Sequence, residues 1–168
     1  MNQVHDISFE EILPIWKKYL WPNKNNIKPI NTWKKNPKGY PYNHGLHKPW
    51  SFNKLITDKS IESQTPYFFG IYEKDILVAV NSGYKTDDEN FRSRGLYVLP
   101  EYRNRGYGKT LLNHVIHIAY ASGSDICWTV PRKDALPCYE SCGFEMKGTW
   151  FHTDFSVSCY AELDLNKL

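Results

Sequence analysis

The stretch that decides the fold is LYVLPEYRNRGYGKTLL, residues 96–112. Its first three residues suit a strand, which Pro100 ends. A loop containing Gly106 and Gly108 follows, and the chain then takes on the pattern of an amphipathic helix. The start of a helix presents unpaired backbone N–H groups and partial positive charge, so this junction predicts a site for phosphate groups.

The rest of the chain alternates between helix-like and strand-like patterns around this junction. The expected helices are Phe9–Leu20, Gly106–Ala121 and Asp134–Cys142. The expected strands are 2–5, Tyr67–Tyr72, Ile76–Tyr84, Phe91–Val98, Asp125–Val130, 144–150 and 155–164, the last two forming a closing hairpin. This order predicts an α+β fold with one parallel crossover, around the second of these helices.

Length and composition are those of an ordinary globular chain. The 168 residues favour a single domain over 1–168, with 41% apolar and 23% charged residues. No apolar run approaches the roughly 20 residues of a membrane span, and the N-terminus lacks the basic and apolar blocks of a secretion signal. We therefore expect a cytoplasmic protein that does not enter a membrane.

The four cysteines do not form a metal-binding pattern. Cys127, Cys138, Cys142 and Cys159 all lie in the last third of the chain, without a C-x-x-C pair. Cys138 and Cys142 are four residues apart, but no second pair or suitably spaced histidine accompanies them, so we expect no metal. Because disulfides are rare in the cytoplasm, we expect small, partly buried free thiols.

The irregular segment 22–57 carries much of the positive charge. No acidic residue lies between Glu11 and Asp58, whereas nine lysines do, and the remainder of the chain holds 12 basic and 18 acidic residues. Tryptophans and tyrosines alternate with these lysines, so we expect an ordered flap with short helical turns at 32–35 and 51–57. The flap either contacts an acceptor or an acidic partner such as nucleic acid, or its aromatic rings pack while its lysines are solvated.

The strand–loop–helix series resembles the acyl-CoA-binding motif of the GNAT superfamily of N-acetyltransferases. In that family, Q/R-x-x-G-x-G/A follows a strand that ends in x-V-x-P, and here the corresponding residues are Val98, Pro100, Arg103, Gly106 and Gly108. Downstream, YESCGF at 139–144 is similar to the family's Y-E-x-x-G-F. The resemblance covers residues 66–165 and implies a three-layer fold, with a central mixed, mostly antiparallel sheet flanked by helices.

The resemblance implies that acetyl-CoA is the co-substrate. Its pyrophosphate would be bound by the amides of the loop, where the glycines permit close approach. Its pantetheine arm would pair with the edge of the preceding strand. The residues expected to bind it are Leu96, Tyr97, Val98, Arg103, Asn104, Arg105, Gly106, Tyr107, Gly108 and Lys109.

The resemblance also implies a general acid, Tyr139, which would protonate the departing CoA thiolate. Alternatively, its ring only packs, or its hydroxyl donates a hydrogen bond to the sulfur without transferring a proton. Arg132 stands where many members have asparagine, and it would either contact CoA phosphates or be solvated. Thr129 stands where some relatives have a glutamate base, so the amine must lose its proton to water, a histidine, or an acid of the 87–89 turn.

The resemblance therefore implies an N-acetyltransferase that acts by direct attack of a primary amine, from a small molecule or a protein, on acetyl-CoA. The alternative is a non-catalytic module of the same fold, which binds nucleic acid or a protein partner through the flap. We expect the acceptor pocket to be built from the flap and from loops 86–90 and 151–156. The closing hairpin of this family often supports dimers, so both a monomer and a homodimer remain open.

Overall fold

The structure is a computed structural model, and it describes residues 2–30, 65–152 and 155–168. The helical turns predicted at 32–35 and 51–57 lie outside these ranges, as does most of the basic flap. The hypothesis that the flap binds nucleic acid or a protein partner therefore stays a prediction.

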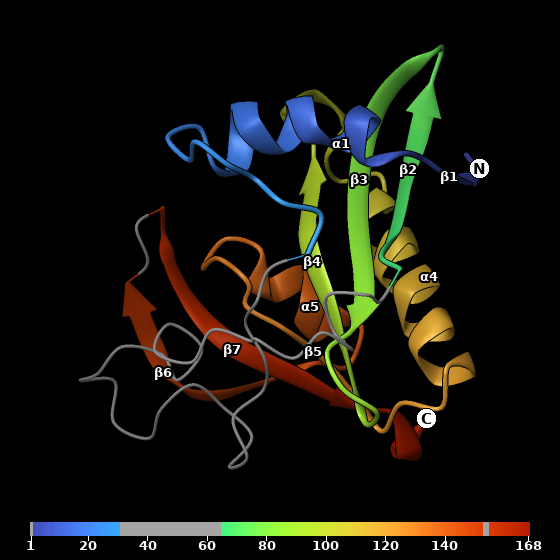
Figure 1. Ribbon diagram of the computed structural model, residues 1–168, viewed down its shortest axis with the longest axis vertical. Coiled ribbons are helices and arrows are strands. Elements are labelled where there is room, and N and C mark those ends of the chain that lie inside the picture. The colour runs from blue at the N-terminus through green and yellow to red at the C-terminus, as the bar shows by residue number, and fades with distance from the viewer. Residues whose placement is uncertain (1, 31–64, 153–154) are drawn as a thin grey trace.

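A mixed sheet forms the middle layer of the described residues (Figure 1). Its strands, in the spatial order β1-β2-β3-β4-β5-β7-β6, are β1 Val4–Asp6, β2 Tyr67–Glu73, β3 Ile76–Lys85, β4 Asn90–Val98, β5 Ile126–Thr129, β6 Glu145–His152 and β7 Val157–Asp164. The β4–β5 pair is parallel, and the other neighbouring pairs are antiparallel. The predicted mostly antiparallel sheet with one crossover is therefore confirmed.

Helices cover both faces of this sheet. On one face lie α1 Phe9–Ile15 and its π-helical continuation η1 Trp16–Leu20, and on the other lie α4 Tyr107–Ala121 and α5 Leu136–Ser141 (Figure 1). The alternation of side chains along β2 explains this arrangement. Phe68 packs in the Trp16 cluster, whereas its neighbour Phe69 packs against α4. Two short 3-10 segments, η2 Pro100–Tyr102 and η3 Leu165–Lys167, complete the described elements.

Each long helix is stabilised where the sequence indicates. Ser8 caps α1 through a reciprocal pair with Glu11, with N···O distances of 3.0 and 3.1 Å. The apolar stripe of α4 is buried against the sheet, and burial of each large aliphatic side chain contributes about 1.5–3 kcal/mol. The predicted extent of the first helix is confirmed, although Trp21 N–H bonds Trp16 C=O, five residues back, at 2.8 Å.

None of the helices in the described ranges is long and apolar enough to cross a membrane. Within the same ranges, no group of three or more His, Cys, Asp or Glu side chains could hold a metal ion. All four cysteines are free thiols, as predicted.

Candidate active site

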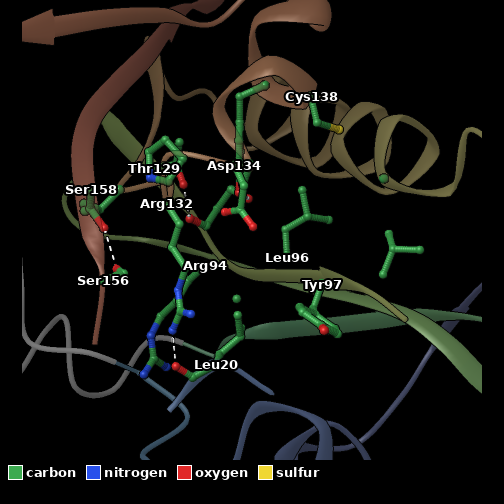
Figure 2. Close-up of a pocket in the computed structure, with 18 of the residues that line it drawn as sticks. Leu20, Arg94, Leu96, Tyr97, Thr129, Arg132, Asp134, Cys138, Ser156 and Ser158 are labelled. Atoms are coloured by element: carbon green, nitrogen blue, oxygen red, sulfur yellow. Dashed lines mark hydrogen bonds between the residues drawn. The ribbon is translucent and has the colours of Figure 1, made fainter. Parts of the chain in front are cut away.

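A cleft opens where β4 and β5 separate. These strands pair only between Asn90–Arg92 and Ile126–Trp128, although β4 continues to Val98. Beyond the last of these pairs β4 contains a β-bulge, in which two of its residues, Gly95 and Leu96, lie opposite a single residue of β3. The resulting cleft has a volume of about 1010 Å³ (Figure 2).

The bulge depends on Gly95, which the sequence did not single out. Gly95 has φ +80°, a left-handed conformation that side chains disfavour, and a Cβ there would lie 2.5 Å from Cζ2 of Trp16. Its carbonyl accepts a hydrogen bond from Trp16 Nε1–H at 2.9 Å. Trp16 of η1 therefore holds the bulge of β4 in place beside the cleft.

One end of the cleft is the start of α4. Gly106, in the left-handed conformation at φ +84°, precedes the helix and offers no side-chain cap. Asn104 is also left-handed, at φ +63°. The first N–H groups of α4 therefore have no partner within the helix and can bind an anion. A Cβ on Gly108 would lie 3.0 Å from Cys138 Sγ, so the absence of a side chain there allows α4 to pack closely on α5.

The strand end beside this loop is rigidly held. Arg103 donates from Nε to the Val98 carbonyl at 2.9 Å, and its guanidinium lies 5.2 Å from the centroid of the Tyr97 ring. Tyr97 stacks on Tyr19 of η1, with ring centroids 4.8 Å apart. These contacts fix the backbone of the last residues of β4 along one wall of the cleft.

Nine of the ten residues predicted to bind the co-substrate line the cleft; they are Leu96, Tyr97, Val98, Arg103, Asn104, Gly106, Tyr107, Gly108 and Lys109. The exception is Arg105, which pairs instead with Glu73 at 2.8 Å. Tyr107 donates to the same carboxylate at 2.5 Å. These hydrogen bonds, led by that from Tyr107, lower the pKa of the Glu73 carboxyl. The Arg105 side chain thus anchors the loop to β2 and faces away from the cleft.

Tyr139 of α5 lies at the inner part of the cleft. Its side chain is buried, its ring packs edge-on against Phe144 with centroids 5.2 Å apart, and its hydroxyl lies 3.4 Å from the Ser93 hydroxyl. Burial raises the pKa of Tyr139 to about 12, although its hydrogen bonds with Ser93 and Thr129 act in the opposite direction. The hydroxyl therefore stays protonated at neutral pH and can act as a hydrogen-bond donor.

Thr129 occupies the position at which some relatives carry a base, and in this protein its hydroxyl has a structural role. Thr129 donates its hydroxyl hydrogen to the Ser93 carbonyl at 3.0 Å, across the gap between β5 and β4. This hydrogen bond joins the strands just beyond their last paired residues. Thr129 therefore helps to fix the Ser93 hydroxyl that faces Tyr139.

The cleft includes part of the predicted acceptor side. His152 and Ser156, from the 151–156 loop, line the cleft as expected. None of the residues of loop 86–90 lines this cleft, so the part of that loop in an acceptor pocket stays a prediction. Asp87 instead accepts hydrogen bonds from Glu89 N–H and Asn90 N–H, at 2.9 and 3.0 Å, and so closes the turn before β4. That turn lies at the opposite end of the strand from Val98.

Three arginines besides Arg103 add charge to the cleft, and the sequence indicated a contact for only one of these three. Arg92 and Arg94 belong to β4 and are 6% and 3% exposed. Arg132 is half-buried, not solvated, and donates to the Leu20 carbonyl across the cleft. One feature of the sequence could have indicated these buried arginines. Basic residues alternate within a strand, in FRSR at 91–94, which is unusual for a strand with both faces covered.

This combination of a bulged strand, a diverging parallel neighbour and an uncapped helix start between them is the architecture of the acyl-CoA N-acyltransferases. The family model for the acetyltransferase (GNAT) family matches residues 27–144, so the chain belongs to that family. The predicted fold class and family are thereby confirmed.

Individual relatives agree with this assignment. The chain is 43% identical over 63 residues to an uncharacterized N-acetyltransferase of Brevibacillus brevis, a match that spans 32% of this chain and 40% of the relative. An IAA acetyltransferase from Bacillus cereus superposes with a TM-score of 0.62 at 11% identity, covering 98% and 99% of the two chains. A Bacillus subtilis acetyltransferase in complex with CoA gives 0.61 at 15% identity, with the same coverage.

Proposed function

We propose that this chain transfers the acetyl group of acetyl-CoA to a primary amine by direct attack of the amine on the thioester. The observation that carries the proposal is the continuity of the cleft. It runs from the uncapped start of α4, past the part of β4 beyond its pairing with β5, to the buried hydroxyl of Tyr139. Membership of the acetyltransferase (GNAT) family supports the same reaction.

Coenzyme A suits the residues of this cleft. Its pyrophosphate would accept hydrogen bonds from the backbone amides of Gly106–Lys109, with additional attraction from the charges of Arg103 and Lys109. A Cβ on Gly106 would meet no atom within 4 Å, so there is open space at the helix start for a ligand. Arg105 would contribute only its backbone amide, because its side chain is paired with Glu73.

The pantetheine arm would lie along β4. Its amides can pair with the backbone of Leu96–Val98 in the way that an added strand would. That edge is available because β5 leaves β4 after Arg92. An arm extended along this edge from the start of α4 would carry the thioester toward Ser93 and Tyr139.

The chemistry follows from the groups at that point. The amine nitrogen forms a bond to the thioester carbon, the carbon–sulfur bond breaks, and the bonding electron pair goes to sulfur. Tyr139 donates its hydroxyl hydrogen toward that sulfur. Asp134 and His152 line the cleft and can accept the proton that the amine loses. Holding the two reactants in one cleft supplies most of the rate enhancement.

A pair of glycine substitutions tests the co-substrate site. Gly106 and Gly123 flank the two ends of α4, both are left-handed, and neither has an atom within 4 Å of a built Cβ. Gly106→Asp and Gly123→Asp therefore carry similar backbone strain, but only the former places a negative charge in the cleft. We expect Gly106→Asp to weaken acetyl-CoA binding at least about tenfold by calorimetry and to slow CoA release with a panel of amines, peptides and tRNA. Equal affinities of the two variants for acetyl-CoA would show that the co-substrate does not bind at the start of α4.

A further inference from the structure

Arg94 is a buried cation in the wall of the cleft. Its guanidinium packs against both Trp16 and Trp21, 4.9 and 4.8 Å from the centroids of their rings. It donates to the carbonyls of Lys28 and Pro29, at 2.8 and 3.3 Å. These contacts hold the guanidinium in one place, and the cleft gives a ligand access to it.

The charge of Arg94 lacks a counterion among the described residues. It forms no ion pair with a carboxylate there, and its buried Nε–H has no hydrogen-bond partner. Burial lowers the pKa of Arg94 to about 10, which reflects the difficulty of keeping a cation out of water. Removing an unpaired charge from water is among the most costly features of a folded protein, so an anion that reached this site would be strongly favoured.

Other cations surround the same part of the cleft. Arg92 lies two residues earlier on β4, and Lys24 follows η1. Burial, followed by the charges of Arg94 and Arg92, lowers the pKa of the Lys24 ammonium. Figure 2 shows Arg94 and Arg132 reaching toward the same region beside Leu20. Asp134 is the only acidic residue among the described residues that line the cleft.

The position of this cluster relates it to the acceptor and not to the phosphates of CoA. Arg94 follows Ser93, whose hydroxyl faces Tyr139, and it lies on the other side of the bulge from the loop that leads into α4. We propose that the acceptor amine carries an anionic group, a carboxylate or a phosphate, which Arg94 binds with the support of Arg132 and Lys24. The inference rests on the proposed acetyl transfer and names the class of amine that takes part.

The anion site can be tested without turnover. With CoA present at saturation, to occupy the loop before α4, inorganic phosphate at constant ionic strength should raise the melting temperature of the wild-type protein by at least about 2 °C. Arg94→Gln should abolish this shift. Lys85→Gln, which removes one positive charge away from the cleft, should keep it. If Arg94→Gln does not fold, the half-buried Arg132→Gln replaces it and should reduce the shift. Equal shifts in all proteins overturn the proposal.

The acceptor class is tested with matched amines: glycine against glycinamide, β-alanine against its amide, and phosphoethanolamine against ethanolamine. The wild-type protein should acetylate the anionic member of at least one pair with a kcat/KM at least about tenfold higher, and Arg94→Gln should bring that ratio close to one. Faster acetylation of the neutral members overturns the anionic acceptor but leaves acetyl transfer standing. If no amine is acetylated while phosphate stabilises only proteins that retain Arg94, the proposed reaction fails and the anion site stands.

Discussion

Replacement of Tyr139 by phenylalanine isolates the hydroxyl proposed to assist the departure of CoA. The ring would keep its packing against Phe144 and its place in the core. The hydroxyl would lose its contacts with Ser93, at a long 3.4 Å, and with Thr129, but Ser93 retains its hydrogen bonds with Asn81 and Thr129 its bond to the Ser93 carbonyl. We therefore expect the free energy of unfolding to change by no more than about 1 kcal/mol. A change in rate would then report on the acetyl-transfer step and not on a loss of folded protein.

The size of the kinetic effect follows from the raised pKa of Tyr139. A hydroxyl with a pKa of about 12 is a weaker acid than a thiol, whose ordinary pKa is about 8.5, and complete proton transfer would be uphill by about 5 kcal/mol. A hydrogen bond to the developing thiolate contributes about 1.5–3 kcal/mol instead, which corresponds to a fall in kcat of about 10- to 150-fold for Tyr139→Phe. The KM for acetyl-CoA should change little.

Initial rates of CoA release, supported by single-turnover measurements, provide the assay. Tyr160→Phe is a matched control because Tyr160 is also buried and its hydroxyl donates to Glu162 at 2.9 Å, outside the cleft lining. Because the hydroxyl of Tyr139 loses its proton only near pH 12, it should produce no falling limb in the rate between about pH 6 and 10. Unchanged turnover in Tyr139→Phe, or a falling limb near pH 9 that this substitution removes, would refute the reasoning.

Two further predictions concern packing around the cleft. Gly95→Ala would combine the strain of a left-handed alanine with overlap on the buried Trp16 ring, so it should destabilise the protein by about 2–5 kcal/mol; a urea midpoint close to that of the wild type would contradict the proposed bulge geometry. Cys138 lines the cleft, whereas Cys142, about one turn further along, does not. Saturating CoA should therefore slow alkylation of Cys138 but not of Cys142, as measured by peptide mass spectrometry, while the fully buried Cys127 stays unmodified; equal slowing of both half-buried thiols would indicate a general stiffening instead.

The parts of the fold that local patterns determine could be predicted from the sequence. The apolar stripe of α4, the Pro100 strand end and the turn at Lys74–Asp75 each depend on residues close together in the chain. Accordingly, the observed ends of the helices and strands lie within two residues of the predicted ends. The order of these elements was sufficient to predict the layers and the parallel crossover.

The features that the sequence could not predict depend on contacts between distant elements. Gly95 appears unremarkable in FRSRGLYV until Trp16, 79 residues away, is known to pack on it. Arg94 appears to be a surface residue of a strand until Trp16 of η1 and Trp21 after it are known to pack against its guanidinium. Loop 86–90 carries no motif that shows its role, and the hydrogen bonds by which Asp87 closes this turn are visible only in the structure.

The hydrogen bond between Trp16 and the carbonyl of Gly95 has a consequence for engineering. It ties η1 to the part of β4 where we propose that the acceptor binds, while the loop before α4 is anchored separately through Arg105 and Glu73. The two ends of the cleft are thus modular. Exchanging the segment from Trp16 to Lys28 for that of another family member should retarget the enzyme to a different amine while its donor preference is inherited unchanged.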